Sequence, residues 1–183
     1  MYGTRVDNDK SYGAWGQQIG FDVYVSDDLE NWSEPRCVLE KNGDFWATMD
    51  FWAPEVHAYN GRFYMLATFK APGRHRATHI LVSDTPDGTF VPVSPDPATP
   101  ADWESLDGTL YIDKNGDPYI IFCHEWAQIG DGTVCATKLS RDLTAPLSEP
   151  RVLWRASDFE QVQTVRPGTT SYVTDGPFLH RVR

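Results

Sequence analysis

Residues 51–69 read FWAPEVHAYNGRFYMLATF. Two runs rich in aromatic and β-forming residues flank the dipeptide Asn60-Gly61, and this arrangement is a strong signal for a tight antiparallel hairpin. The pattern returns at 106–122, where Asn115-Gly116 separates two further runs. A first strand begins a third time at 174–180, TDGPFLH. Each of these strands opens beside an acidic residue, so the sequence predicts repeated hairpins with carboxylates at matching places.

A second element recurs after the hairpins. Its serines, Ser26, Ser83 and Ser140, are 57 residues apart in both intervals. Self-similarity at a fixed period indicates a repeat architecture, in which each unit is a copy of one small structure. The three copies of this strand and turn are VYVSDDL at 23–29, ILVSD at 80–84 and TKLSRDL at 137–143.

Each unit therefore holds two hairpins, or four short strands. A four-stranded sheet repeating at this period is typical of a propeller blade, because a small twisted sheet must stack on copies of itself to bury both faces. The sequence predicts an all-β propeller, with a meandering β-sandwich as the alternative. One short helical turn is expected at Ser157–Glu160, where the residues have capping-box spacing.

The repeat also sets the expected boundaries. Closed propellers have at least four blades, so the predicted units are expected to be an interior part of a longer propeller. They are the later half of a first blade at 1–40, a second blade at 51–94, a third at 103–153 and the first strand of a fourth at 172–183.

The composition excludes several classes of protein. With 40% apolar residues among 183, the chain can form a sizeable core and is too apolar for disorder. The formal net charge of −10 argues against nucleic acid or an anionic membrane as a partner. Three cysteines, Cys37, Cys123 and Cys135, lack the spacing of a disulfide framework or a metal site, so buried thiols are expected.

Nothing in the sequence identifies a cellular location. No apolar run approaches the roughly 20 residues needed to span a bilayer, and the first five residues do not resemble a signal peptide. Any targeting segment would lie upstream of Met1, which leaves cytoplasmic and secreted locations open.

Three motifs in order carry a family resemblance. They are Trp52-Ala53-Pro54-Glu55 before a hairpin, Asp107 just before the paired strands of the next unit, and the acidic-Gly-Pro triplet at 175–177. Together they resemble glycoside hydrolase family 43, and the resemblance covers nearly the whole chain. It implies a five-bladed β-propeller that acts on arabinan or xylan.

The resemblance also implies catalytic residues. Three carboxylates carry the reaction in this family, and the base would lie in a strand upstream of Met1. Asp107 matches the carboxylate that orients the acid and adjusts its pKa, although Gly108 stands where proline is usual. Asp175 stands where the family has the glutamate that acts as general acid, and its side chain is shorter by about 1.5 Å. Glu125 is the alternative acid.

The chemistry supports these residue types independently. Inverting hydrolysis needs one carboxylic acid to protonate the leaving oxygen and one carboxylate to activate water, both held by rigid elements around one pocket. Inner strands of a propeller converge on an axis and would supply such positions. The plainer interpretation of Asp107 and Asp175 is that they are strand-start residues that hydrogen-bond to their own turns.

Further residues flanking the acidic positions are candidates for substrate binding. Aromatic side chains could stack on a sugar or simply pack the blades, and the polar ones could bind hydroxyl groups or serve as structural partners. The candidates for stacking are Phe51, Trp52 and Trp126, and those for polar contact are Glu55, His124 and Glu125.

The expected function is therefore a glycosidase acting on arabinose- or xylose-containing plant polysaccharides or oligosaccharides. The alternatives are a propeller that binds carbohydrate without cleaving it and, less favoured, a protein-interaction propeller of kelch type, whose paired glycines are missing here. No cofactor is expected to be required, and ligands for a structural cation near the axis are not identifiable. Residues 1–183 alone are expected to be inactive.

Overall fold

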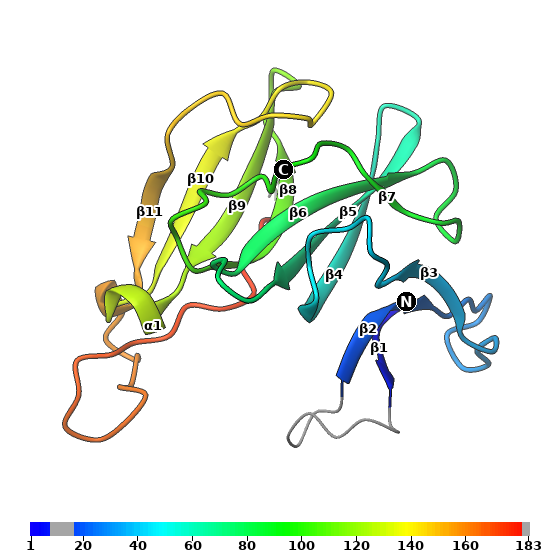
Figure 1. The fold of residues 1–183 in the computed structure, drawn as a ribbon. Helices are drawn as coiled ribbons and strands as arrows, with labels where there is room; N and C mark the ends of the chain where they lie inside the picture. The colour runs from blue at the N-terminus through cyan, green and yellow to red at the C-terminus, as the bar shows by residue number, and fades with distance from the viewer. Residues whose placement is uncertain (8–16, 181–183) are drawn as a thin grey trace.

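The computed structural model of the chain describes residues 1–7 and 17–180. It is nearly all β, with three antiparallel sheets that follow one another in chain order (Figure 1). The first sheet has three strands and each of the other two has four. The strands are β1 (Tyr2–Asp7), β2 (Gln17–Val23) and β3 (Arg36–Glu40); β4 (Met49–Tyr59), β5 (Arg62–Lys70), β6 (Ala77–Ser83) and β7 (Val91–Pro92); and β8 (Ser105–Ile112), β9 (Pro118–His124), β10 (Thr133–Lys138) and β11 (Arg151–Arg155).

The hairpin predicted from Asn60-Gly61 joins β4 to β5. Tyr59 pairs with Arg62, and both central residues have positive φ, 48° at Asn60 and 79° at Gly61. Positive φ at both positions suits the right-handed twist of the flanking strands, which is why Asn-Gly is favoured here. The loop of the second hairpin is longer: Ile112 pairs with Pro118, and residues 113–117 lie between them.

Aromatic and aliphatic side chains fill the space between neighbouring sheets. Phe21 of β2 packs edge-on against Phe51 of β4 and Phe69 of β5, and all three rings are fully buried. On the other side of the second sheet, Ile80 belongs to a buried cluster with Phe122 of the third. Burial of both sheet faces against neighbouring copies is the packing expected of stacked blades.

The described residues also contain two short helical segments. The α-helix α1 (Trp126–Ile129) follows β9 and was not predicted, because four residues are too few to show a helical period. The 3₁₀ turn η2 (Ala156–Asp158) overlaps the short helical turn expected at Ser157–Glu160. No helix in the described part of the chain is long and apolar enough to cross a membrane.

The last described segment, up to residue 180, differs from the strand expected at 172–183, of which 181–183 lie outside the described residues. Tyr172 makes one parallel bridge to Asp131, and within the described residues 173–180 no ladder pairing follows. A strand needs a partner along its length, and the described chain offers this segment only that bridge. The segment crosses near the ends of β8 and β9, as the red trace in Figure 1 shows.

Candidate active site

The backbone of β8 is irregular where it carries Asp107. The pairing of β8 with β9 shifts register between Leu106 and Thr109, and Asp107 has a φ of 54°. The Asp107 N–H donates to Thr68 Oγ1 at 2.9 Å, so it bonds to a buried hydroxyl of the neighbouring sheet instead of β9. A bulge of this kind re-aims a side chain, and here the Asp107 carboxylate leaves the plane of its sheet.

Gly108 continues the same irregularity. Its N–H donates to Thr78 Oγ1 at 3.1 Å, and a β-carbon at this position would lie 2.5 Å from Thr78 Cγ2. A proline at 108 would remove the donor and meet the same obstacle. Glycine at 108 therefore fits beside the threonine at 78.

Asp50 occupies the matching place in the previous blade. It precedes Asp107 by the repeat distance of 57 residues, has a φ of 55°, and lies at a register shift of β4. Its Oδ2 accepts hydrogen bonds from Arg76 Nε at 3.1 Å and Nη2 at 3.0 Å. Sequence reasoning missed Asp50, although the repeat spacing could have identified it.

The last segment brings Asp175 to Asp107. The Gly176 N–H donates to Asp107 Oδ2 at 3.0 Å, although 69 residues separate the two in sequence. Burial raises the pKa of Asp107, the hydrogen bond from Gly176 lowers it, and the negative charge of Asp175 raises it further. One side of the exposed Asp175 is shielded by protein, which raises the pKa of its carboxyl, while Arg76 works to lower it.

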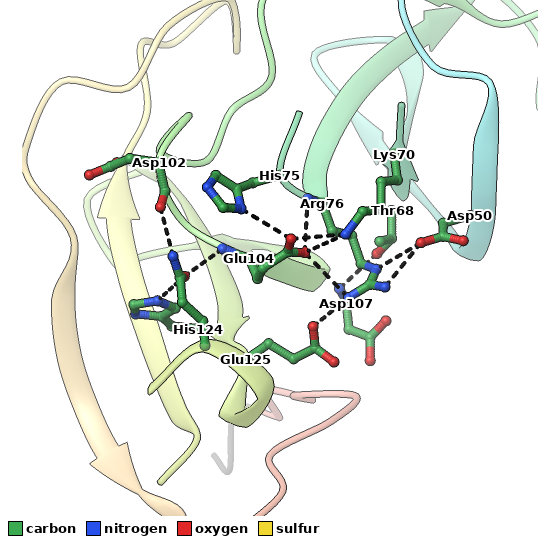
Figure 2. Close-up of polar contacts among 11 residues, drawn as sticks. Asp50, Thr68, Lys70, His75, Arg76, Asp102, Glu104, Asp107, His124 and Glu125 are labelled. Atoms are coloured by element: carbon green, nitrogen blue, oxygen red, sulfur yellow. Dashed lines mark hydrogen bonds and ion pairs between the residues drawn. The ribbon is translucent and has the colours of Figure 1, made fainter. Parts of the chain in front are cut away.

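Glu125 is the third carboxylate at this place. It follows β9 directly, pairs with Arg76 Nη1, and has a side chain that is 14% exposed. Burial raises its pKa, Arg76 opposes that shift, and the charges of Glu104 and Asp175 add to it. Figure 2 shows Glu125 and Asp107 on the same side of the Arg76 guanidinium, with Asp50 beyond it.

Glu104 ties the second sheet to the third beside this group. Its carboxylate accepts from Lys70 Nζ at 2.8 Å, from the Arg76 N–H at 3.0 Å, and lies 3.0 Å from His75 Nδ1. Burial works to raise the pKa of Glu104, but these hydrogen bonds dominate and lower it to about 2. No recognisable motif contains Lys70, Arg76 or Glu104, so no sequence pattern marks them as part of the site.

Two of the candidate binding residues are structural instead. Phe51 is fully buried between the first two sheets, so it has no free face for a sugar. His124 is buried, stacks on Trp103 with 3.9 Å between ring centroids, and has Nε2 2.8 Å from Gln128 Oε1. For both residues the packing alternative replaces the expected substrate contact.

The other candidates lie at or near the surface. Trp52 carries the Arg76 guanidinium over its ring at 4.6 Å, so it belongs to the same group as the carboxylates. Glu55 Oε1 lies 3.1 Å from His57 Nε2, and Trp126 opens α1 as a half-buried residue. Their contact with a substrate stays a prediction.

The arrangement suits proton transfer between a carboxyl and a substrate. It offers neighbouring carboxyls in different surroundings, which is how similar acids take different roles at one pH. The Cys123 thiol is fully buried, and burial raises its pKa to about 12, so it stays protonated and is a poor nucleophile. Among the described residues no three His, Cys, Asp or Glu side chains are grouped to hold a metal ion.

Comparison with known proteins agrees with this description. The family model of Glycosyl hydrolases family 43 matches residues 4–183. Extracellular endo-alpha-(1->5)-L-arabinanase 1 of Bacillus subtilis (strain 168) is 22% identical over 161 residues, covering 78% of this chain and 47% of its own length. Xylosidase/arabinosidase 43A of Humicola insolens is 26% identical over 134 residues, covering 72% and 39%. The chain thus spans about half the length of these curated relatives or less.

Solved structures show the same relationship. The endo-arabinase from Bacteroides thetaiotaomicron VPI-5482 is 42% identical with a TM-score of 0.86, covering 90% of this chain and 58% of its own. A thermostable family-43 glycoside hydrolase is 26% identical with a TM-score of 0.63, covering 75% and 46%. The all-β fold of propeller blades predicted from the repeat is confirmed.

Proposed function

Because the chain belongs to family 43 of the glycosyl hydrolases, we propose that the protein hydrolyses glycosidic bonds in arabinose- or xylose-containing plant polysaccharides or oligosaccharides. Arabinan is the first substrate to test, since the endo-arabinase structure shares 42% identity with this chain. The observation that carries the proposal is the hydrogen bond from Gly176 to Asp107, which brings two candidate catalytic carboxyls together.

In the proposed reaction Asp175 is the general acid. Its carboxyl gives a proton to the glycosidic oxygen as the bond between that oxygen and the anomeric carbon breaks. Water adds to the anomeric carbon from the opposite face and loses its proton to a base, which inversion places about 6.5–9.5 Å from the acid. Asp107 stays ionised beside Asp175 and favours the protonated state of its neighbour.

Substitution of the two aspartates tests these roles. The variants are made in the complete gene product that contains these residues. Asp175→Asn should lower turnover of arabinan by about 100-fold or more, and should lose much less on an aryl glycoside with an acidic leaving group, which needs little protonation. Asp107→Asn should lower turnover of arabinan by a similar factor, because it removes the charge that tunes the acid.

The matched control is Asp27→Asn, a change at an exposed turn residue of the first sheet. It should leave turnover unchanged. If both site variants hydrolyse arabinan and xylan as well as the unchanged protein does, the assignment fails, and Asp107 and Asp175 have a structural role only.

A carbohydrate-binding protein without hydrolytic activity is the second candidate. The shorter aspartate at 175 favours it, because a misplacement of about 1 Å at a reacting group can cost on the order of 100-fold in rate. Arabinan that is retained by the immobilised protein and recovered uncut would support this function. Release of reducing sugar that disappears in Asp175→Asn would exclude it.

A further inference from the structure

Arg76 lies at the junction of the two four-stranded sheets, directly before β6. Its guanidinium bonds to Asp50 of β4, lies 3.5 Å from Glu104 Oε2, and pairs with Glu125 after β9. The side chain is 14% exposed and rests over the ring of Trp52. A planar guanidinium can bond to several carboxylates at once in fixed directions, so Arg76 holds groups from both sheets in place.

The charges around Arg76 are mostly negative. Asp50 from β4 and Glu104 before β8 face it, as do Glu125, Asp107 and Asp175. Lys70 of β5 and His75 are the other basic groups, and both bond to Glu104. Arg76 acts on Glu125, Asp107 and Asp175 together, and Lys70 adds to its effect on Glu125.

Its effect on these carboxyls is unequal. Glu125 is in direct contact with the guanidinium. Among the described residues the Asp175 side chain has neither a hydrogen bond nor an ion pair, and Arg76 reaches it only through its field. An opposite charge in contact favours ionisation much more than one at longer range.

We propose that Arg76 is a positioning residue that keeps Glu125 ionised and fixed in place, and thereby reserves the role of proton donor for Asp175. This inference rests on the proposed hydrolysis for the identity of the donor. Because a carboxylate in an ion pair binds a proton less readily, Arg76 makes Glu125 the poorer proton donor of the two. Asp50 holds the guanidinium from the opposite side and orients it toward Glu125.

The direct test is a ¹³C NMR titration of the carboxyl groups, which needs no turnover. The resonance of Glu125 is identified by its loss in Glu125→Gln, and that of Asp175 by its loss in Asp175→Asn. Burial raises the pKa of both carboxyls, so the test compares how far each midpoint moves when Arg76 is changed. In Arg76→Met the midpoint of Glu125 should rise by about one pH unit or more, and that of Asp175 by less.

Two further variants keep the test decisive. Arg76→Lys retains the positive charge but loses the forked guanidinium, so it should raise the midpoint of Glu125 by less than Arg76→Met does. It also provides a measurement if Arg76→Met does not fold. Arg62→Met removes an arginine that pairs with Asp84 at the exposed end of the same sheet, and should change neither midpoint. A Glu125 midpoint that is unmoved in both Arg76 variants, or that moves no further than the Asp175 midpoint, overturns the proposal.

Kinetics provide a second measurement that separates this inference from the proposed function. If Asp175 is the donor, Glu125→Gln should lower turnover by a similar factor for good and poor leaving groups, whereas Asp175→Asn should be selective for poor ones. A leaving-group-selective loss in Glu125→Gln overturns the assignment of the donor. If the unchanged protein hydrolyses no substrate, the proposed function fails, and the titration still decides whether Arg76 controls Glu125.

Discussion

At Gly108 the backbone of β8 passes so close to Thr78 that a side chain does not fit. An added β-carbon would lie 2.5 Å from Thr78 Cγ2, 2.9 Å from its Oγ1 and 3.0 Å from Ile120 Cδ1. The contact lets the Gly108 N–H reach the Thr78 hydroxyl, and the neighbouring Asp107 keeps its left-handed conformation. The position of a catalytic candidate therefore depends on a residue that carries no chemistry.

We expect Gly108→Ala to destabilise the protein by about 1–3 kcal/mol, because the added methyl group overpacks a buried contact. Gly43→Ala is the control, since nothing lies within 4 Å of a β-carbon there, and its effect should stay within about 0.5 kcal/mol. Urea denaturation midpoints of the complete gene product measure both. Equal midpoints for the two variants would show that the close approach at Gly108 relaxes at little cost.

Single residues also show what the sequence could and could not predict about the site. Asp107 and Asp175 lie in motifs, so they could be selected without coordinates, and the structure brings them together. Arg76 could not, because its importance comes from a guanidinium that reaches both sheets. Phe51 was expected to contact substrate, but it packs against the first sheet. The alternation of side chains along a strand does not reveal which face of a blade meets another sheet.

Individual strands are also tied to the loops around them by polar side chains. His79 of β6 is fully buried between the loop before β4 and the loop after β7. Trp46 Nε1–H donates to its Nδ1 at 3.0 Å, so Nδ1 is unprotonated and Nε2–H donates to the Ser94 carbonyl at 3.1 Å. Only the neutral imidazole fits this pair of bonds, and burial lowers the pKa of His79 to about 4.

This histidine makes stability depend on pH. The unfolded chain takes up a proton near pH 6.5 and the folded protein near pH 4, so the folded state loses stability as the pH falls through this range. The loss should reach about 3 kcal/mol, and His79→Gln should remove it. His180→Gln, at an exposed residue, should not change the slope. Denaturant midpoints between pH 7 and 4.5 measure the change in stability with pH. The same pH dependence in His79→Gln as in the unchanged protein would contradict the prediction.

The strands and helices also show how far the fold could be predicted from the sequence. The hairpin at Asn60-Gly61 could be predicted because the turn chemistry and both strands are local. The segment at 173–180 was expected to form a strand because it repeats the motif that opens the earlier strands. Pairing depends on a partner strand, which a local pattern does not reveal. The helix α1 is set by tertiary bonds such as Gln128 Oε1 to the Glu104 N–H at 2.7 Å, and these leave no periodic signal.

Across the whole molecule, the candidate site lies where the second and third sheets meet and the last segment crosses them. Apolar side chains are left uncovered in the described chain: Val152 and Leu153 of β11, in the third sheet, are each 42% exposed, and Phe178 of the last segment is 78% exposed. Exposed apolar groups on a sheet edge favour association. We therefore expect residues 1–183, expressed alone, to self-associate, as sedimentation velocity would show.

We also expect residues 1–183 alone to show no detectable glycosidase activity. Inversion needs a base across the sugar from the acid. The carboxylates whose pKa responds to Asp175 in the described chain are Asp107 and Glu125; the first accepts the Gly176 N–H and the second is paired with Arg76. The ion pair with Arg76 makes Glu125 a poor base, and Asp107 has the tuning role proposed above, so we expect the base to come from another residue. Turnover of an aryl arabinofuranoside or xyloside by the purified 183-residue chain, lost in Asp175→Asn, would show that this chain supplies the base itself.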